Sequence, residues 1–150
     1  MIHNREELWF LGGRVSVRRP AADAAGPSVT EQLLPRGYAP PLHMHEREDE
    51  IFHLLEGEMR LRVGEDEVVV RPGDTLLAPR GVPHGFRVES ELARVLVITT
   101  AGDFEAMMRE VAQPAGAGPP EAAEPTPEMA EALTAACARH HIAVVGPPMA

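Results

Sequence analysis

The stretch that decides the fold is residues 37–50, GYAPPLHMHEREDE, in which His43 and His45 precede a run of acidic side chains. Residues i and i+2 of an extended strand point to the same side, so both imidazoles face one way. A carboxylate that follows after a short bend can close on the same point. Imidazole and carboxylate together suit Fe, Mn, Ni, Cu or Zn rather than a thiophilic ion. Taken alone, the pair also fits two solvated histidines on an edge strand.

Short β-prone runs separated by turn residues extend on both sides of this stretch. In residues 58–63, EMRLRV, every second side chain is apolar, which places Met59, Leu61 and Val63 on one face of a pleated strand. Many short strands without intervening helices predict an all-β barrel or sandwich. The expected strands are Leu8–Leu11, Arg14–Arg18, Ser28–Leu34, Ile51–Leu55, Met59–Val63, Glu67–Arg71, Thr75–Ala78, Gly85–Glu89 and Arg94–Thr99.

A second stretch, residues 73–86, GDTLLAPRGVPHGF, places His84 at the end of a Pro- and Gly-rich turn that enters another strand. The first stretch fits the first motif of the cupin family, which reads Gly, five residues, His-x-His, four residues, Glu, six residues, Gly from Gly37 to Gly57. The second fits the second cupin motif, which reads Gly, five residues, Pro-x-Gly, two residues, His from Gly73 onward. Fifteen residues separate the two, a short spacing similar to that of small microbial cupins.

The resemblance implies a double-stranded β-helix, the small jelly-roll barrel, with four residues converging inside it as metal ligands. These ligands would be His43, His45, Glu50 and His84. Glu50 is favoured because it keeps both family spacings, and Glu48 is the runner-up. The family usually has Asn four residues after the last His, where this chain has Val88; the resemblance implies that the metal ligands are unaffected but that an amide which supports them or positions substrate is absent.

A closer likeness is to the single-domain quercetin-dioxygenase-like cupins. It is carried by Leu8–Gly12, Pro40–His45, Glu48–Phe52, Leu55–Gly57 and Pro79–His84. It implies a mononuclear metal-dependent oxidoreductase that holds one divalent transition metal (Fe, Mn, Ni, Cu or Zn) and acts on a small aromatic or enolic substrate. Two other interpretations stay open: an O2-independent metal-dependent isomerase, lyase or cyclase, and a cupin that binds a small molecule without turnover.

In the leading interpretation, Glu50 has a second role as a base that leaves the metal to accept a substrate proton. The residues with the parity to face inward beside the ligands would form a mostly apolar substrate pocket. These are Phe52, Leu54, Met59, Leu61, Phe86 and Val88. His53 has the opposite parity and is expected outside the barrel. Glu46, Glu48 and Asp49 are expected on a solvated loop face.

The composition of the chain argues against several classes of partner and of structure. The chain of 150 residues carries a formal charge of −9, and its 14 basic residues are all Arg, which argues against binding to nucleic acid or an anionic membrane. No apolar run approaches the ~18 residues of a membrane span, and Met1–Glu7 lacks the apolar core of a signal peptide. A lone cysteine, Cys137, excludes an intrachain disulfide and predicts a small buried residue. We therefore expect a soluble cytoplasmic protein.

The chain changes character near Ala101. We expect a barrel over residues 1–101 and a helical tail over 102–150 that packs on it, with a Pro-, Gly- and Ala-rich linker at 113–126. Asp103 and Thr126 are the expected N-caps of two tail helices, and residues 142–145 could add a last strand. Apolar side chains on outer strand faces, Ile51, Leu55 and Val69, suggest that the protein is a homodimer.

Overall fold

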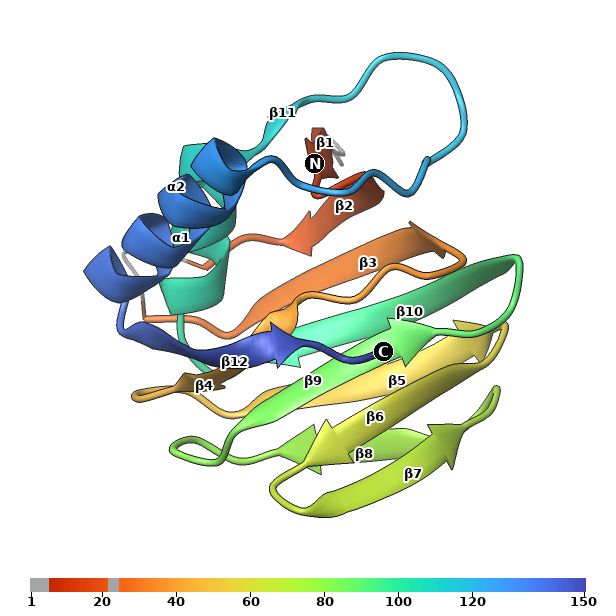
Figure 1. Ribbon diagram of the computed structural model, residues 1–150, viewed down its shortest axis with the longest axis horizontal. Helices are drawn as coiled ribbons and strands as arrows, with labels where there is room; N and C mark the ends of the chain where they lie inside the picture. Colours follow the sequence, from red (N-terminus) through yellow and green to blue (C-terminus); the bar gives the residue numbers. More distant parts are fainter. Residues whose placement is uncertain (1–5, 22–24) are drawn as a thin grey trace.

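The structure is a computed structural model that describes residues 6–21 and 25–150. It consists of two antiparallel sheets, with two helices side by side at one end (Figure 1). The elements in chain order are β1 Glu6–Phe10, β2 Gly13–Arg19, β3 Ser28–Pro35, β4 Pro41–His45, β5 Glu50–Glu56, β6 Met59–Val63, β7 Asp66–Val70, β8 Thr75–Ala78, β9 His84–Val88, β10 Leu92–Thr99, α1 Asp103–Val111, β11 Gln113–Pro114, α2 Pro127–Arg139 and β12 Ile142–Pro148.

The strands form a jelly roll, which confirms the predicted all-β class. One sheet has the order β11-β1-β2-β3-β10-β5-β8 and the other β12-β4-β9-β6-β7. Each of the nine predicted strands is present, with boundaries that differ by at most two residues. The sheets enclose a core of alternating side chains: Phe52 and Leu54 of β5 are buried, whereas His53 between them is only half-buried and faces outward. The expected outward position of His53 is confirmed.

A second apolar cluster joins the helices to the barrel. It is made by side chains of β1, β2, α1, α2 and β12: Leu8, Phe10, Val15, Val17, Phe104, Met107, Met108, Leu133, Ala136, Cys137 and Ile142. Cys137 is buried there, as predicted, and burial raises the pKa of its thiol to about 11. The helices are therefore packed parts of the molecule and not a loose extension.

The two predicted helix starts differ in outcome. Thr126 is the N-cap of α2, and its side chain accepts a hydrogen bond from the Met129 amide. The prediction for Asp103 is wrong: Gly102 is the N-cap of α1 and Asp103 is its first helical residue. The Asp103 carboxylate is instead bound by the Arg47 guanidinium through two hydrogen bonds of 2.7 and 3.1 Å. This long-range ion pair replaces the local cap that the sequence suggested.

The segments around the helices are more ordered than their composition suggests. Within the predicted linker, β11 pairs with β1, and Pro120 is buried. At the end of the chain, β12 pairs with β4 and so places the tail inside the same sheet as the two histidines. The boundary between barrel and tail at residue 101 stays a prediction. β12 lies in the predicted tail but pairs with β4 of the predicted barrel.

Within the described ranges, no helix is both long and apolar enough to cross a membrane. Residues 1–5, on which most of the signal-peptide expectation rests, lie outside those ranges.

The packing of α2 gives a testable prediction. Leu133 is 7% exposed in the second cluster, whereas Met129 of the same helix is 52% exposed. Truncating a buried Leu removes apolar contacts and leaves a void, so Leu133→Ala should lower the free energy of unfolding by about 2–5 kcal/mol. Met129→Ala, the matched control, should change it by less than about 0.5 kcal/mol. Urea denaturation measures both, and equally small effects would show that α2 is not docked.

Candidate metal centre

Three strands bring the predicted ligands together. His43 and His45 lie two residues apart on β4, Glu50 begins β5, and His84 begins β9. The β4–β9 pairing sets His43 directly opposite His84. One potential ligand atom from each of the four residues lies within 4.8 Å of all the others, and His45, Glu50 and His84 are buried. Strand pairing and the pleat thus account for a cluster that spans 42 residues of sequence.

Each histidine directs one ring nitrogen away from the centre. Nδ1 of His43 lies 2.6 Å from the Pro41 carbonyl oxygen, and Nδ1 of His84 lies 3.4 Å from that of Val82. A carbonyl oxygen only accepts, so Nδ1 is the donor in both contacts, and a ring that has given up its Nε2 proton can bind a ligand through that nitrogen. Nδ1 of His45 instead faces a carboxylate, at 2.7 Å from Oε2 of Glu48. All three rings are therefore held with Nε2 available for a ligand bond.

Glu50 lies among these nitrogens. Its Oε2 is 2.8 Å from Nε2 of His84 and 3.0 Å from Nε2 of His45. Burial opposes the ionisation of Glu50, but the charges and hydrogen bonds of His45 and His84 hold its pKa well below the usual range. Burial also lowers the pKa of His45, yet Glu50 and Glu48 outweigh it and raise that pKa to about 10. Burial, reinforced by His84, lowers the pKa of His43 to about 4, so its ring is neutral.

The cluster fits a divalent transition metal. Among the described residues, Nε2 of His45 is buried without a well-aligned hydrogen-bond partner, although it faces the other ligand atoms. Buried polar atoms are rarely left unpaired, and a site for an ion is one of the ordinary reasons for such an exception. Three imidazoles and one carboxylate, with no thiolate, are a donor set for Fe, Mn, Ni, Cu or Zn. The residues present are thus able to bind a metal ion.

The acidic loop after His45 differs from the prediction. The expectation of a solvated face is wrong for Glu48, which is 0% exposed. Glu46 is exposed, and the half-exposed Asp49 is bonded by Arg80. Glu48 turns inward, and its Oε2 accepts hydrogen bonds from His45 and from the Phe104 amide. The i+3 spacing from His45 was a local signal for the first of these contacts.

An apolar cavity opens beside the cluster. It is lined by Phe10, Leu11, Gln32, Tyr38, Pro40, Pro41, His43, His45, Glu50, Phe52, Phe86, Val97, Phe104, Met107, Leu133, Cys137, Ile142 and Val144. In the part of the chain that the structure describes, neither Arg nor Asp is among these residues, and Glu50 is the one carboxylate. Most of the surface is hydrocarbon, and burial raises the pKa of the Tyr38 phenol so that it stays neutral.

Of the six residues predicted for the substrate pocket, two line the cavity and four do not. Phe52 and Phe86 line the cavity. The other four residues point inward but are buried in the barrel core and are absent from the lining: Leu54, Met59, Leu61 and Val88. Strand parity predicts the face that a side chain occupies but not how far along the barrel axis it lies. The wall contributed by α1, α2 and β12 has no local sequence signal, because it depends on how the tail folds back.

Comparison with known proteins agrees with this architecture. Residues 29–99 match a family model described as the cupin domain. Quercetin 2,3-dioxygenase of Bacillus subtilis is 32% identical over 72 residues, which is 48% of this chain and 21% of that protein. An uncharacterized protein of Methanocaldococcus jannaschii is 33% identical over 57 residues, 38% of this chain and 46% of that protein. The chain therefore spans less than half the length of either curated relative.

Solved structures share the fold. TT1209 from Thermus thermophilus is 36% identical with a TM-score of 0.50, over 57% of this chain and 83% of that one. A predicted oxalate decarboxylase from Thermotoga maritima aligns with a TM-score of 0.53 at 22% identity, over 66% of this chain and 97% of that one. At that identity the second likeness concerns the fold alone. With the two motifs, the jelly roll and the matched domain in place, the chain is a member of the cupin superfamily.

Proposed function

We propose that this cupin is a mononuclear metal-dependent oxidoreductase of the dioxygenase type, acting on a small, uncharged aromatic or enolic molecule. The observation that carries the proposal is the cluster of His43, His45, Glu50 and His84, the first three of which line an apolar cavity. When bound by these four residues, a divalent transition metal supplies a Lewis acid, and a redox-active one where the ion is Fe, Mn, Ni or Cu.

Glu50 is the proposed base. It is the one carboxylate that lines the cavity among the described residues, so a hydroxyl group of a bound substrate can donate its proton there. Its Oε2 already lies within 3.0 Å of two imidazole nitrogens. Protonation of Glu50 would leave a phenolate or enolate oxygen beside the centre, which is the electron-rich form of such a substrate.

The cavity wall supports an uncharged substrate. Aromatic side chains surround the centre, and Phe10 and Phe104 pack edge-to-face with centroids 6.0 Å apart. No Arg of the described ranges lines the cavity, so an anionic substituent away from the metal centre would lose its hydration without gaining a guanidinium partner. The same apolar wall excludes water from the reacting atoms. The sequence relationship to a quercetin 2,3-dioxygenase favours this class of chemistry.

We further propose that the protein acts in the cytoplasm as a homodimer. Support for the dimer comes from the exposed apolar side chains on outer strand faces, which include Val69 and Leu77. Of the residues named from the sequence, Val69 is exposed, whereas Ile51 and Leu55 are half-buried.

Metal content tests the centre. Protein purified without chelator should carry about one divalent transition-metal ion per chain, measured by inductively coupled plasma mass spectrometry. His84→Ala should lose most of that metal, because one of four ligands is gone. His53→Ala is the matched control, since its ring faces outward and contacts Thr75 at 2.7 Å; its metal content should equal that of the wild type. Equal metal content in the two variants would contradict the assignment.

Oxygen consumption tests the reaction. Protein loaded in turn with Fe, Mn, Ni and Cu should consume O2 with uncharged phenols or flavonols, and much less with their carboxylated analogues. An oxygen electrode measures this, with His84→Ala as the inactive control. Equal turnover under strict anaerobiosis would instead indicate an O2-independent isomerase, lyase or cyclase. Absence of turnover across the panel would contradict the enzyme assignment and leave a small-molecule-binding cupin.

A further inference from the structure

One of the three histidines is held differently from the others. The rings of His43 and His84 are held by backbone carbonyls two residues earlier in the chain, whereas His45 is held by the Glu48 carboxylate. Glu48 is 0% exposed and is not one of the clustered ligands. A fully buried carboxylate is costly unless its charge is compensated, so its presence needs a physical reason.

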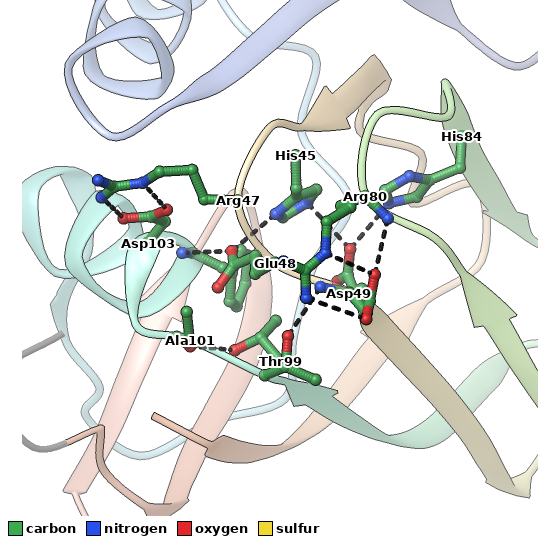
Figure 2. Close-up of polar contacts among 12 residues, drawn as sticks. His45, Arg47, Glu48, Asp49, Arg80, His84, Thr99, Ala101 and Asp103 are labelled. Atoms are coloured by element: carbon green, nitrogen blue, oxygen red, sulfur yellow. Dashed lines mark hydrogen bonds and ion pairs between the residues drawn. The ribbon is translucent and has the colours of Figure 1, made fainter. Parts of the chain in front are cut away.

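The contacts of Glu48 are few and specific. Oε2 accepts two hydrogen bonds, from Nδ1 of His45 at 2.7 Å and from the Phe104 amide at 2.8 Å, and Oε1 has no hydrogen-bond partner within the described ranges. Figure 2 shows Glu48 between the His45 ring and the start of α1, with the Arg47–Asp103 pair beside it. Arg47 is the nearest guanidinium in sequence, and its hydrogen bonds go to Asp103 and not to Glu48.

The bond to Phe104 replaces a missing cap. Gly102, the N-cap of α1, offers no side chain to the free amides of the first turn. Glu48 supplies the acceptor from another part of the chain, and its negative charge also suits the positive end of a helix. Because Phe104 and Met107 of α1 line the cavity, one carboxylate connects the cavity wall to the His45 ring.

The charges of the two buried carboxylates match that of a divalent cation. Glu48 and Glu50 are two buried carboxylates on opposite sides of the His45 ring, one at each ring nitrogen. Three neutral imidazoles contribute no charge to a filled centre. Two negative charges around a divalent cation give a neutral buried unit, whereas Glu50 alone would leave one positive charge in an apolar surrounding.

We propose that Glu48 is a positioning residue of the metal centre: it fixes the His45 ring with Nε2 toward the ligand cluster and supplies the second negative charge that a buried divalent ion needs. The carboxylate also makes the imidazole a more basic donor, an effect that acids bonded to a metal-binding histidine commonly have. This role rests on the metal part of the proposed function and not on the oxygen chemistry.

Metal alone is therefore the probe. Wild type, Glu48→Gln, Glu48→Ala and Glu46→Gln are titrated with Co2+, with affinity taken from competition against a chelator and the site from its visible absorption. Glu48→Gln keeps an oxygen for both hydrogen bonds but removes the charge, and it should weaken binding about 10-fold. Glu48→Ala removes both effects, should weaken binding up to about 100-fold, and should change the Co2+ spectrum. Glu46→Gln removes an exposed charge and should match the wild type.

A second measurement separates positioning from general damage to the fold. In Zn2+-loaded, 15N-labelled protein, the imidazole resonances of His45 should report Nδ1–H with bound Nε2 in the wild type and in Glu48→Gln. In Glu48→Ala they should shift or broaden, while those of His43 and His84 stay in place. Unchanged His45 resonances together with wild-type affinity in both Glu48 variants would overturn the proposal. If the wild type itself binds no metal, the proposed function fails first, so the two failures are distinguishable.

Discussion

The rest of the structure depends on burying ionisable side chains inside an apolar barrel. Carboxylates and imidazoles lose hydration there, and each needs a partner with complementary charge or hydrogen-bonding capacity. The protein meets this need by placing Glu50 between two imidazoles and by giving the Nδ1 of each clustered histidine an acceptor. What is left over is a set of ligand atoms facing one point, with Nε2 of His45 lacking a well-aligned hydrogen bond among the described residues. A divalent ion is the group that satisfies all of them at once.

The sheets hold this arrangement because each ligand is fixed by strand pairing. β4 lies between β9 and β12, so the His-x-His segment is bonded on both edges and cannot slide without losing its hydrogen bonds. Glu50 enters at the first residue of β5 and is fixed against β8 and β10. The tail then completes the site on the other side, because α1 and α2 cover the cavity with Phe104, Met107 and Leu133. Ligand geometry comes from the barrel, and the apolar enclosure comes largely from the tail.

Much of this could be predicted from the sequence, for identifiable reasons. Pleat parity places His43 and His45 on one face, and the motif spacings identify Glu50 and His84 as their partners. The strands were predictable because each is a short β-prone run between turn residues, and several of these runs alternate between apolar and polar side chains. Which inward-facing residues line the cavity was not predictable. Strand parity correctly predicts that Leu54 and Val88 face inward, but it does not predict their position along the barrel axis. Such positions depend on sheet twist and strand register, which single runs of sequence do not specify.

The role of Glu48 was hidden for another reason. Acidic residues in a loop are ordinarily solvated, and what turns this one inward is the Phe104 amide, 56 residues further along the chain. Asp103 also has a partner 56 residues away in the sequence: it is bound by Arg47 and does not act as the expected N-cap. Both contacts join the metal-site loop to α1. Contacts between such distant residues can be identified only in the folded structure, where α1 lies against the loop.

The measurement that tests the central claim most directly is anomalous diffraction from crystals of the metal-loaded protein, recorded at the absorption edge of the bound ion. The proposed centre predicts a single strong peak per chain, within bonding distance of Nε2 of His43, His45 and His84 and of a Glu50 carboxylate oxygen. A map with no peak there, or with its main peak elsewhere, would contradict the assignment of these four residues as the metal centre.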